Sequence, residues 1–317
     1  MNVVVLDGYL VNHDRLPWAV AERFPDLVWY DETPDALAAQ RIGDAEAVFV
    51  NRTRLDGPTL RRCPKLRYIG VFGTGYNIID LSAAGELGIT VCNVPEYSSY
   101  AVAQHAMALL LAVTNRAAEF SAYVKAGKWT LPADPGVTAV PMTELSGKTL
   151  GILGCGSIGR VFGEACRALG MRVLGCRRHP DGREPFPMVP LETLRRESDV
   201  LSLHCPLTEE TRGLIDREFL SEMRRGAILL NTARGAILNE ADVAAALDSG
   251  QLSAAGVDVL AAEPAGPESP LVRHPKCIVT PHVSWGPKET RQRLLQTAGE
   301  NFFAFLEGAP QNVVKTV

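Results

Sequence analysis

Few of the features that mark secreted, membrane or nucleic-acid-coating proteins occur in this chain of 317 residues. Its seven cysteines are odd in number and include no CxxC pair, which indicates reduced thiols in a cytoplasmic protein rather than a disulfide framework. The sequence opens without a cationic segment and a long apolar core, so no secretory signal is expected. The longest apolar stretch, around residues 106–113, is too short to span a bilayer, so no membrane partner is expected.

Charge balance and side-chain spacing disfavour two further classes of site. The 32 basic and 36 acidic residues leave a net charge of −4, which argues against a nucleic-acid partner. No cluster of His, Cys and Asp residues has metal-ligand spacing, so no metal site is expected. The sequence also has no G-x-S-x-G hydrolase signature, no repeat of fixed period and no low-complexity tract.

The chain does contain short apolar strands that alternate with helical segments. We expect strands at 2–6, 47–50, 66–71, 90–92, 149–153, 172–175, 200–204, 227–231, 255–259 and 277–280. Helices are expected at 34–41, 81–87, 99–116, 158–169, 191–197, 216–223, 240–249 and 287–306, with a loop at 128–141. This alternation predicts parallel sheets with right-handed crossovers, and a chain about twice the usual domain length favours two domains.

A glycine-rich loop carries the clearest ligand signal. Gly154-Cys155-Gly156-Ser157-Ile158-Gly159 fits G-x-G-x-x-G and lies between the expected strand 149–153 and helix 158–169. In this pattern the first glycine permits a tight turn, the second lets a pyrophosphate approach the backbone, and the third lets the helix pack on the strand. The helix N-terminus then offers N–H groups to the phosphates. The alternative, a glycine-rich turn without a ligand, is disfavoured by this context.

The residues after the next expected strand favour NADP over NAD. Sites selective for NAD place an acid about 20 residues after the glycines, where it holds the ribose 2′-hydroxyl. Here Cys176, Arg177 and Arg178 carry no carboxylate. A guanidinium can instead pair with the 2′-phosphate of NADP. The alternative is that both arginines mark a solvated strand end and that NAD is used.

Three later segments place polar side chains at the ends of expected strands. Arg234 follows the strand at 227–231, Glu263 follows the one at 255–259, and His282 follows the one at 277–280. Because ligands bind at the carboxyl ends of strands in doubly wound sheets, we expect these side chains to converge beside the cofactor. Each alone is more typical of a surface, a loop or a packed core position. Their order behind a nucleotide-binding loop favours a catalytic set.

As an ordered set, these motifs resemble the D-specific 2-hydroxyacid dehydrogenases. The matching pieces span nearly the whole chain: GTGYNIID (73–80), NVPEYSSYAVAQHAMALLL (93–111), GKTLGILGCGSIGR (147–160), SLHCPLTEETRGLI (202–215), LLNTARGAILNEADVAAAL (229–247), AGVDVLAAEP (255–264) and TPHVSWG (280–286). The opening MNVVVLDGY and the segment Asn51-Arg52-Thr53 are most similar to the hydroxypyruvate reductase (glycerate dehydrogenase) branch.

The resemblance implies an α/β fold of two doubly wound parallel-sheet domains. A Rossmann-like cofactor domain would comprise residues 99–285. A flavodoxin-like substrate domain would comprise residues 1–98 plus 286–317. The resemblance also implies a homodimer, formed largely through the helix at 99–116 and the loop that follows it.

Reaction chemistry is assigned by the resemblance to three residues. Arg234 would bind the substrate carboxylate and polarise the 2-oxo group through its planar fork of donors. His282 would be the general acid in reduction and the base in oxidation. Glu263 would hydrogen-bond His282, orient its ring and favour its charged form. The nicotinamide would supply the hydride.

Further positions carry over from the resemblance as binding residues. Around the cofactor they are Gly154, Gly156, Ser157, Ile158, Gly159, Arg177, Arg178, His204, Pro206, Thr211, Thr232, Ala233 and Asp258, the last beside the nicotinamide carboxamide. Around the substrate they are Arg52, Thr74, Gly75, Arg234, His282 and Trp285. Three of these positions also have a structural interpretation without a ligand. Arg52 could be a surface residue, Thr74-Gly75 a tight turn, and Trp285 a packing residue. His105 is expected to be a packed helix residue.

The resemblance therefore implies an enzyme that transfers hydride between NAD(P)H and a short 2-oxo acid to give the D-2-hydroxy acid. Hydroxypyruvate and glyoxylate are the leading substrates. Two alternatives stay open: a nucleotide-sensing, corepressor-like binding protein on the same fold, and a short phosphoglycerate dehydrogenase. A formate dehydrogenase is disfavoured because the chain keeps the Glu263-Pro264 motif that orients the acid–base histidine.

Overall fold

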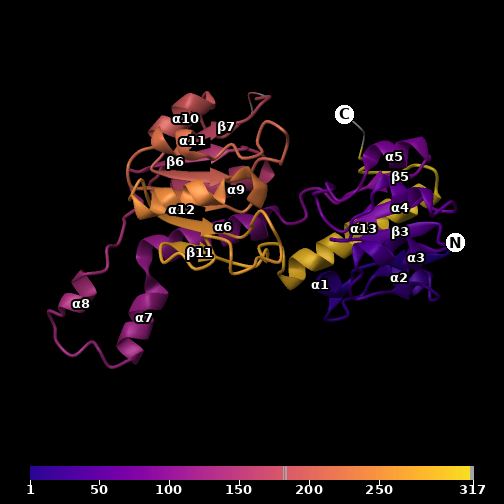
Figure 1. Cartoon of the computed structure of the whole chain (residues 1–317), viewed down its shortest axis with the longest axis horizontal. Coiled ribbons are helices and arrows are strands. Elements are labelled where there is room, and N and C mark those ends of the chain that lie inside the picture. Colours follow the sequence, from indigo (N-terminus) through magenta and orange to yellow (C-terminus); the bar gives the residue numbers. More distant parts are fainter. Residues whose placement is uncertain (181, 183, 315–317) are drawn as a thin grey trace. The chain divides into compact units, whose positions relative to one another are not determined.

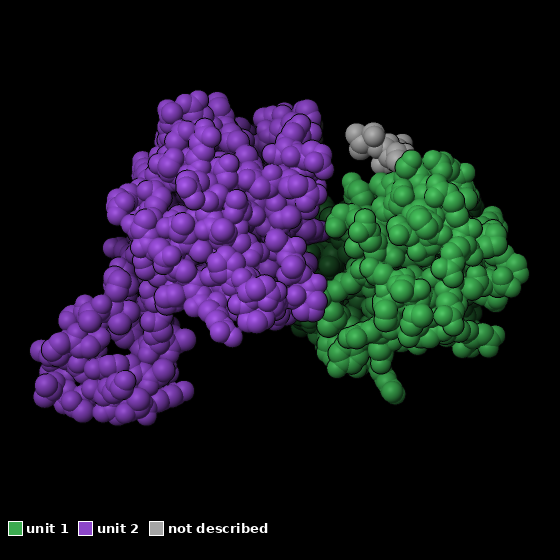
Figure 2. Space-filling view, in the orientation of Figure 1, with its two compact units in different colours: residues 1–98, 285–317 green, residues 99–284 purple. Residues whose placement is uncertain are grey.

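The computed structural model describes residues 1–180, 182 and 184–314, which form two compact units (Figure 1). Unit 1 contains residues 1–98 and 285–317, and unit 2 contains residues 99–284 (Figure 2). The division falls one residue before the predicted boundary, so Trp285 belongs to unit 1 rather than to unit 2. No helix among the described residues combines the length and the apolar character needed to cross a membrane.

Unit 1 is built on a parallel sheet whose strands lie in the order β2-β1-β3-β4-β5. This is the flavodoxin-like order, and it confirms the predicted fold of this unit. The strands are β1 (Val3–Val5), β2 (Val28–Trp29), β3 (Ala47–Val50), β4 (Tyr68–Val71) and β5 (Thr90–Cys92). Every residue of β1, β3 and β4 is buried, as expected for strands covered on both faces. The two-residue strand β2 was not predicted, since it is too short to show a pattern.

Short helices cover this sheet, and the last helix of the chain completes it. They are α1 (Tyr9–Asn12), α2 (Ala19–Arg23), α3 (Ala38–Ile42, after the 3-10 turn Asp35–Leu37), α4 (Gly57–Arg61), α5 (Leu81–Glu86) and α13 (Lys288–Leu306). From α13, Phe302 packs 5.4 Å from the ring of Phe49 and 5.0 Å from that of Tyr68, centroid to centroid. One core of unit 1 is therefore shared between the two ends of the sequence.

Unit 2 is built on a second parallel sheet, in the order β11-β10-β9-β8-β6-β7. Its strands are β6 (Thr149–Leu153), β7 (Arg172–Cys176), β8 (Val200–Leu203), β9 (Ala227–Asn231), β10 (Leu252–Val257) and β11 (Cys277–Val279). A parallel bridge from Met188 to Gly175 lies beyond β7, where the Rossmann order 3-2-1-4-5-6 has its third strand. The sheet confirms the predicted Rossmann-like unit, with this third strand reduced to one bridge.

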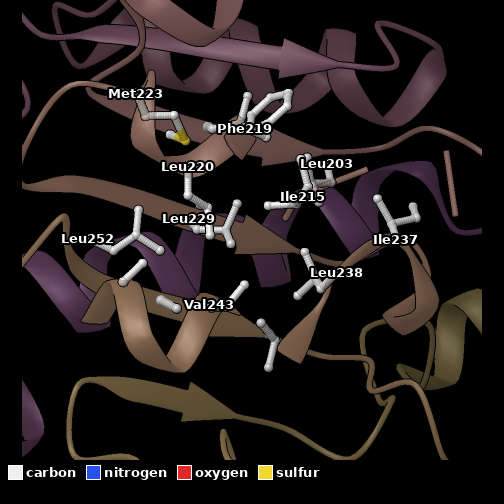
Figure 3. Packing of buried hydrophobic residues seen from close by; sticks show 14 of the residues in the cluster. Leu203, Ile215, Phe219, Leu220, Met223, Leu229, Ile237, Leu238, Val243 and Leu252 are labelled. Carbon is white, nitrogen blue, oxygen red and sulfur yellow. The ribbon is translucent and has the colours of Figure 1, made fainter. Parts of the chain in front are cut away.

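Helices cover both faces of the second sheet. They are α6 (Ser99–Asn115), α9 (Ser157–Ala168), α10 (Leu191–Glu197), α11 (Arg217–Ser221) and α12 (Glu240–Asp248), with a 3-10 turn at Gly235–Ile237. Asp216 and Asn239 begin α11 and α12 by accepting backbone N–H bonds, as helix-capping side chains do. Figure 3 shows Leu203 and Leu229 of the sheet packed with Phe219 and Val243 of these two helices.

An extended arm leaves the rest of unit 2 between α6 and β6 (Figure 1). It contains α7 (Ala117–Lys125) and α8 (Pro135–Thr138), and no residue of either helix is buried. Its tip is held by Asp134, which accepts hydrogen bonds from the Tyr123 hydroxyl at 2.9 Å and the Gly136 N–H at 2.8 Å. A loop was predicted at 128–141, whereas α7 and the short α8 were not.

Candidate active site

The three glycines of the loop after β6 occupy three different environments. Gly154 has φ of +91°, and a Cβ there would lie 2.4 Å from the backbone N of Cys205. At Gly159 a Cβ would lie 2.8 Å from Cγ2 of Ile152 on the strand beneath the helix. Gly156 begins α9, and nothing lies within 4 Å of the position that its Cβ would take. Tight turn, open cradle and close helix packing are the three roles that a dinucleotide-binding loop requires.

Buried polar atoms around this loop also fit a bound dinucleotide. Thr232 follows β9 at the same edge of the sheet, and its buried Oγ1 has no hydrogen-bond partner among the described residues. Buried hydroxyls are normally paired, so an unpaired one indicates a group supplied by a ligand or water. Beside it, the Ala233 N–H donates to Oδ1 of Asn231 at 3.0 Å, which fixes the turn. The first turn of α9, from Ser157 and Ile158 onward, would hold the pyrophosphate.

The loop after β8 passes directly beneath the first glycine. A Cβ on Gly154 would lie 2.5 Å from the carbonyl carbon of His204, so the two loops are in van der Waals contact. Nε2 of His204 lies 2.8 Å from the Ser202 hydroxyl, and burial lowers the pKa of the ring to about 4. Further along, the Thr211 hydroxyl donates to the carbonyl of Pro206 at 2.8 Å and closes the loop. His204, predicted as a cofactor-binding residue, thus has a neutral ring near pH 7, and its backbone adjoins the glycine loop.

Arg177 and Arg178 follow β7, and each lies against a glutamate. Nη1 of Arg177 is 3.3 Å from Oε1 of Glu184, whose side chain is buried. Arg178 forms an ion pair with Glu210, and both of these side chains are exposed. Positions 176–178 carry no acid, but Glu184, further along the chain, brings a carboxylate close to Arg177 in space. The sequence analysis did not select Glu184, because the segment after β7 that contains it has no motif or periodicity.

His282 and Glu263 form a polar pair in the loops that follow β11 and β10. Nδ1 of His282 lies 2.7 Å from Oε2 of Glu263, and about three-tenths of each side chain is exposed. The second oxygen of Glu263 accepts the Leu260 N–H at 3.1 Å, which fixes the carboxylate. The peptide bond between Glu263 and Pro264 is cis. A histidine held at Nδ1 by a carboxylate presents Nε2 to a reacting group.

Asp258 fixes the backbone that carries His282. Its carboxylate is fully buried at the end of β10 and accepts the N–H groups of Val283 at 3.0 Å and Ser284 at 2.9 Å. The His282 N–H donates to the Asp258 carbonyl at 2.8 Å, and His282 has φ of +53°. A left-handed conformation is unfavourable for a histidine and persists where neighbouring bonds impose it. Asp258 thus holds the backbone of His282 in place. Its predicted position beside the nicotinamide carboxamide stays a prediction.

Two residues that the sequence analysis did not select complete this support. The Thr280 hydroxyl donates to Oδ1 of Asp258 at 2.6 Å. Nε2 of His105, on α6, lies 2.9 Å from the same hydroxyl and 3.5 Å from Asp258. His105 was predicted as a packed helix residue, and its ring instead reaches the polar network behind His282. Thr280 directly follows strand β11, and the residues selected from the sequence also follow strands. That position could therefore have identified Thr280 from the sequence.

Arg234 lies on the strand end next to this pair. It begins the 3-10 turn after β9, and β9 and β10 are neighbours in the sheet. Its Nη1 donates to the Ala233 carbonyl at 2.7 Å, and the side chain is partly exposed. A Cβ on Gly235 would lie 1.9 Å from the carbonyl carbon of Leu260, so this turn packs on the loop that leads to Glu263. Arg234, Glu263 and His282 thus belong to adjoining loops at the carboxyl ends of β9, β10 and β11.

The carboxyl edge of the sheet in unit 1 forms a second group of loops. Asp7, directly after β1, accepts the N–H groups of Asn51 at 2.7 Å, Arg52 at 2.5 Å and Thr53 at 2.6 Å. This leaves the Arg52 side chain exposed. Asp7 was not selected from the sequence, although its place at the end of a strand was the same signal that selected the other residues.

The remaining predicted substrate residues also lie in unit 1. The Thr74 hydroxyl donates to the Val94 carbonyl at 2.9 Å, and Asn93 Nδ2 donates to the Thr74 carbonyl at 2.7 Å. These bonds fix the turn that contains Gly75. Trp285 is partly buried against the aromatic core that the sheet of unit 1 shares with α13.

Comparisons with known proteins show the family to which the chain belongs. A family model described as "D-isomer specific 2-hydroxyacid dehydrogenase, NAD binding domain" matches residues 107–284, more than half of the chain. The chain is 41% identical over 320 residues to a hydroxypyruvate reductase of Blautia hydrogenotrophica, with 99% of each chain covered. It is 38% identical over 286 residues to a glycerate dehydrogenase of Methylorubrum extorquens, with 89% of each covered.

A solved structure shows the same architecture. The complex of an acyclic imino acid reductase with NADPH and D-Arg superposes with a TM-score of 0.88 at 26% identity, covering 99% of this chain and 100% of that one. The family model, the curated relatives and the two sheets therefore confirm the resemblance that the motifs indicated. The chain belongs to the family of D-isomer-specific 2-hydroxyacid dehydrogenases, and residues 107–284 form its NAD-binding domain.

Proposed function

We propose that this protein reduces a short 2-oxo acid to the D-2-hydroxy acid with NADPH, and that hydroxypyruvate and glyoxylate are its substrates. The observation that carries the proposal is the 2.7 Å contact between His282 and Glu263, on loops that adjoin that of Arg234. An acid–base histidine beside an arginine is what reduction of a charged 2-oxo acid requires. The relatives named hydroxypyruvate reductase and glycerate dehydrogenase support the substrate class.

Each of the three residues has a distinct task in this reaction. The Arg234 guanidinium binds the substrate carboxylate and polarises the 2-oxo group, so that negative charge can develop on its oxygen. Glu263 accepts a hydrogen bond from Nδ1–H of His282 and keeps Nε2 directed to the substrate. A nicotinamide cofactor, when bound, would supply the hydride for C2. The proton on Nε2 of His282 passes to the oxygen, which becomes the hydroxyl of the product.

The cofactor preference, the compartment and the oligomeric state are part of the same proposal. Arg177 and Arg178 after β7 support NADPH over NADH. The seven cysteines are all free, which fits a cytoplasmic enzyme. The exposed arm, with Trp129 and Leu131 about 60% and 59% exposed, supports a homodimer in which the arm is covered by a second copy.

The test is an absorbance assay of the purified protein with hydroxypyruvate and glyoxylate, using NADPH and NADH in parallel. We expect rapid oxidation of NADPH and slower oxidation of NADH. His282→Ala should lower kcat by about 10²–10⁴-fold while NADPH still binds, because it removes the general acid. Unchanged kcat in this variant, or NADPH binding without turnover on a wider panel of 2-oxo acids, would contradict the proposal. The second result would favour a nucleotide sensor.

A further inference from the structure

Three asparagines of unit 1 form a chain of hydrogen bonds that ends at the turn of residues 73–75. Nδ2 of Asn312 donates to Oδ1 of Asn301 at 2.8 Å, and Nδ2 of Asn301 donates to the Asn93 carbonyl at 2.9 Å. Nδ2 of Asn93 then donates to the Thr74 carbonyl at 2.7 Å. We call the three asparagines the asparagine relay. It joins the C-terminal segment of the chain to a turn that the sequence predicts as part of the substrate site.

Asn301 is the buried centre of the relay. It lies on α13, and only 1% of the residue is exposed. Both polar atoms of its amide are bonded, Oδ1 to Asn312 and Nδ2 to Asn93. Removing one partner of a buried amide is unfavourable, because the freed atom cannot reach water. The relay therefore has one favoured arrangement.

The C-terminal segment also holds the main chain of Asn93. The Asn93 N–H donates to the Asn312 carbonyl at 3.2 Å, and the next pair along, Cys92 and Val313, forms an antiparallel bridge. Asn312 has φ of +50°, a left-handed conformation that asparagine adopts more readily than most residues. Asn93 is thus bonded at both its N–H and its carbonyl. Its side chain consequently leaves the backbone in a defined direction.

The turn at the end of the relay is bonded to the segment after β5 at three points. Besides the bond from Asn93, the Val94 N–H donates to the Gly73 carbonyl at 2.9 Å, and the Thr74 hydroxyl donates to the Val94 carbonyl at 2.9 Å. Within the part of the chain that the structure describes, the N–H groups of Thr74 and Gly75 donate no hydrogen bond. Fixed N–H groups of this kind suit an anion such as a carboxylate.

We propose that the asparagine relay positions this turn for the substrate carboxylate, and that Asn93 is the positioning residue that acts on the turn directly. The inference rests on the proposed function and on the predicted contact of Thr74 and Gly75 with the substrate. Through the relay, the segment after α13 controls affinity for the substrate and leaves affinity for the cofactor alone. The relay consists of neutral amides, so it moves no charge and its effect should not depend on pH.

The first test is Asn93→Ala, which removes the bond to Thr74 and keeps the two main-chain bonds of Asn93. The KM for hydroxypyruvate and for glyoxylate should rise about three- to tenfold with kcat changed less than about twofold, because uniform binding is lost. The Kd for NADPH should stay unchanged, and the rise in KM should be the same at pH 6 and at pH 8. A role limited to folding would instead lower the unfolding temperature and leave KM as it was.

The second test is Asn312→Gly, which removes the far amide and keeps a backbone conformation that glycine adopts readily. It should raise KM about two- to fivefold, since it acts on the turn only through the relay. The control is Gln311→Ala, at the exposed neighbouring position, which should behave like the wild type. Combined with Asn93→Ala, Asn312→Gly should have no further effect on KM. Additive effects of the two substitutions, or an unchanged KM in Asn93→Ala, would overturn the inference.

Oxalate separates a failure of this inference from a failure of the proposed function, because it carries carboxylates but is not reduced. Wild-type protein that turns over no 2-oxo acid would contradict the proposed function, and titration with oxalate would still test the relay. Oxalate should bind Asn93→Ala about three- to tenfold more weakly than the wild type. Equal affinities, or no binding of oxalate to the wild type, would contradict the role of the relay.

Discussion

At the scale of single residues, the site is defined by what holds each functional group still. His282 adopts a left-handed backbone, and Asp258 fixes the residues on its C-terminal side through both carboxylate oxygens. Glu263 fixes the ring itself. Asp258 positions the backbone of His282 and Glu263 positions its imidazole. Substituting one acid at a time can therefore separate these two effects.

Glu263→Gln is expected to lower kcat for reduction by about 10–100-fold with little change in the Kd for NADPH. The amide keeps the size of the side chain but removes the negative charge that holds the imidazole at Nδ1. Steady-state kinetics and cofactor titration measure the two quantities. Glu268→Gln, on the same loop and exposed, is the control and should behave like the wild type. A loss of cofactor affinity equal to the loss of kcat would contradict a role limited to His282.

His204 predicts a pH dependence of stability. Burial lowers the pKa of its ring to about 4, whereas in the unfolded chain it is near 6.5, so the unfolded state binds the proton first as pH falls. Stability contributed by the neutral ring is full above pH 6.5 and is lost toward pH 4, by up to about 3 kcal/mol. Urea unfolding at pH 7 and pH 5 should therefore show a smaller loss in His204→Asn than in the wild type. Equal losses in the two proteins would refute this.

At the scale of helices and strands, two glycines inside long helices have opposite surroundings. A Cβ on Gly163 in α9 would lie 2.5 Å from Cε2 of Phe186, whereas one on Gly299 in α13 would have its nearest contact at 3.5 Å, on Trp18. Gly299→Ala should stabilise the protein by roughly 0.5–1 kcal/mol through helix propensity. Gly163→Ala should destabilise it by roughly 1–3 kcal/mol through overpacking. The urea midpoint of unfolding measures the stability of each variant. A midpoint that shifts in the same direction in both variants would contradict the packing described.

Elements with a strong local pattern were predictable, and those defined by tertiary contacts were not. The strands β6, β8 and β9 are buried throughout and mostly apolar, so the sequence predicts them within a residue. β2 and α7 lack such a pattern, because one has two residues and the other buries none.

The same distinction applies to the site. Arg234, Glu263 and His282 follow strands, and their grouping follows from the topology of a parallel sheet. The contacts of Glu184 with Arg177 and of His105 with Thr280 join segments by side-chain direction alone. Periodicity and motif spacing carry no information on that direction, so these partners could not be predicted.

At the scale of the whole molecule, the arm of unit 2 predicts self-association. Trp129 and Leu131 are large, apolar and exposed on a segment whose helices bury no residue. Replacing both by Asp should convert the proposed dimer to a monomer, since a desolvated contact would acquire two charges. Sedimentation velocity would show the change in mass. Leu87→Asp, at an exposed apolar position of unit 1, is the control that should leave the mass unchanged.

The split of unit 1 between the two ends of the sequence has a consequence for synthesis on the ribosome. Strands β1 to β5 are made first, but Phe302 and the rest of α13, which cover one face of their sheet, are made last. Residues 99–306 take roughly 10–40 s to translate at ordinary rates. During that interval the aromatic rings of Phe49 and Tyr68 lack their contacts with α13. The nascent N-terminal sheet therefore acquires this part of its core only after the inserted nucleotide-binding unit has been made.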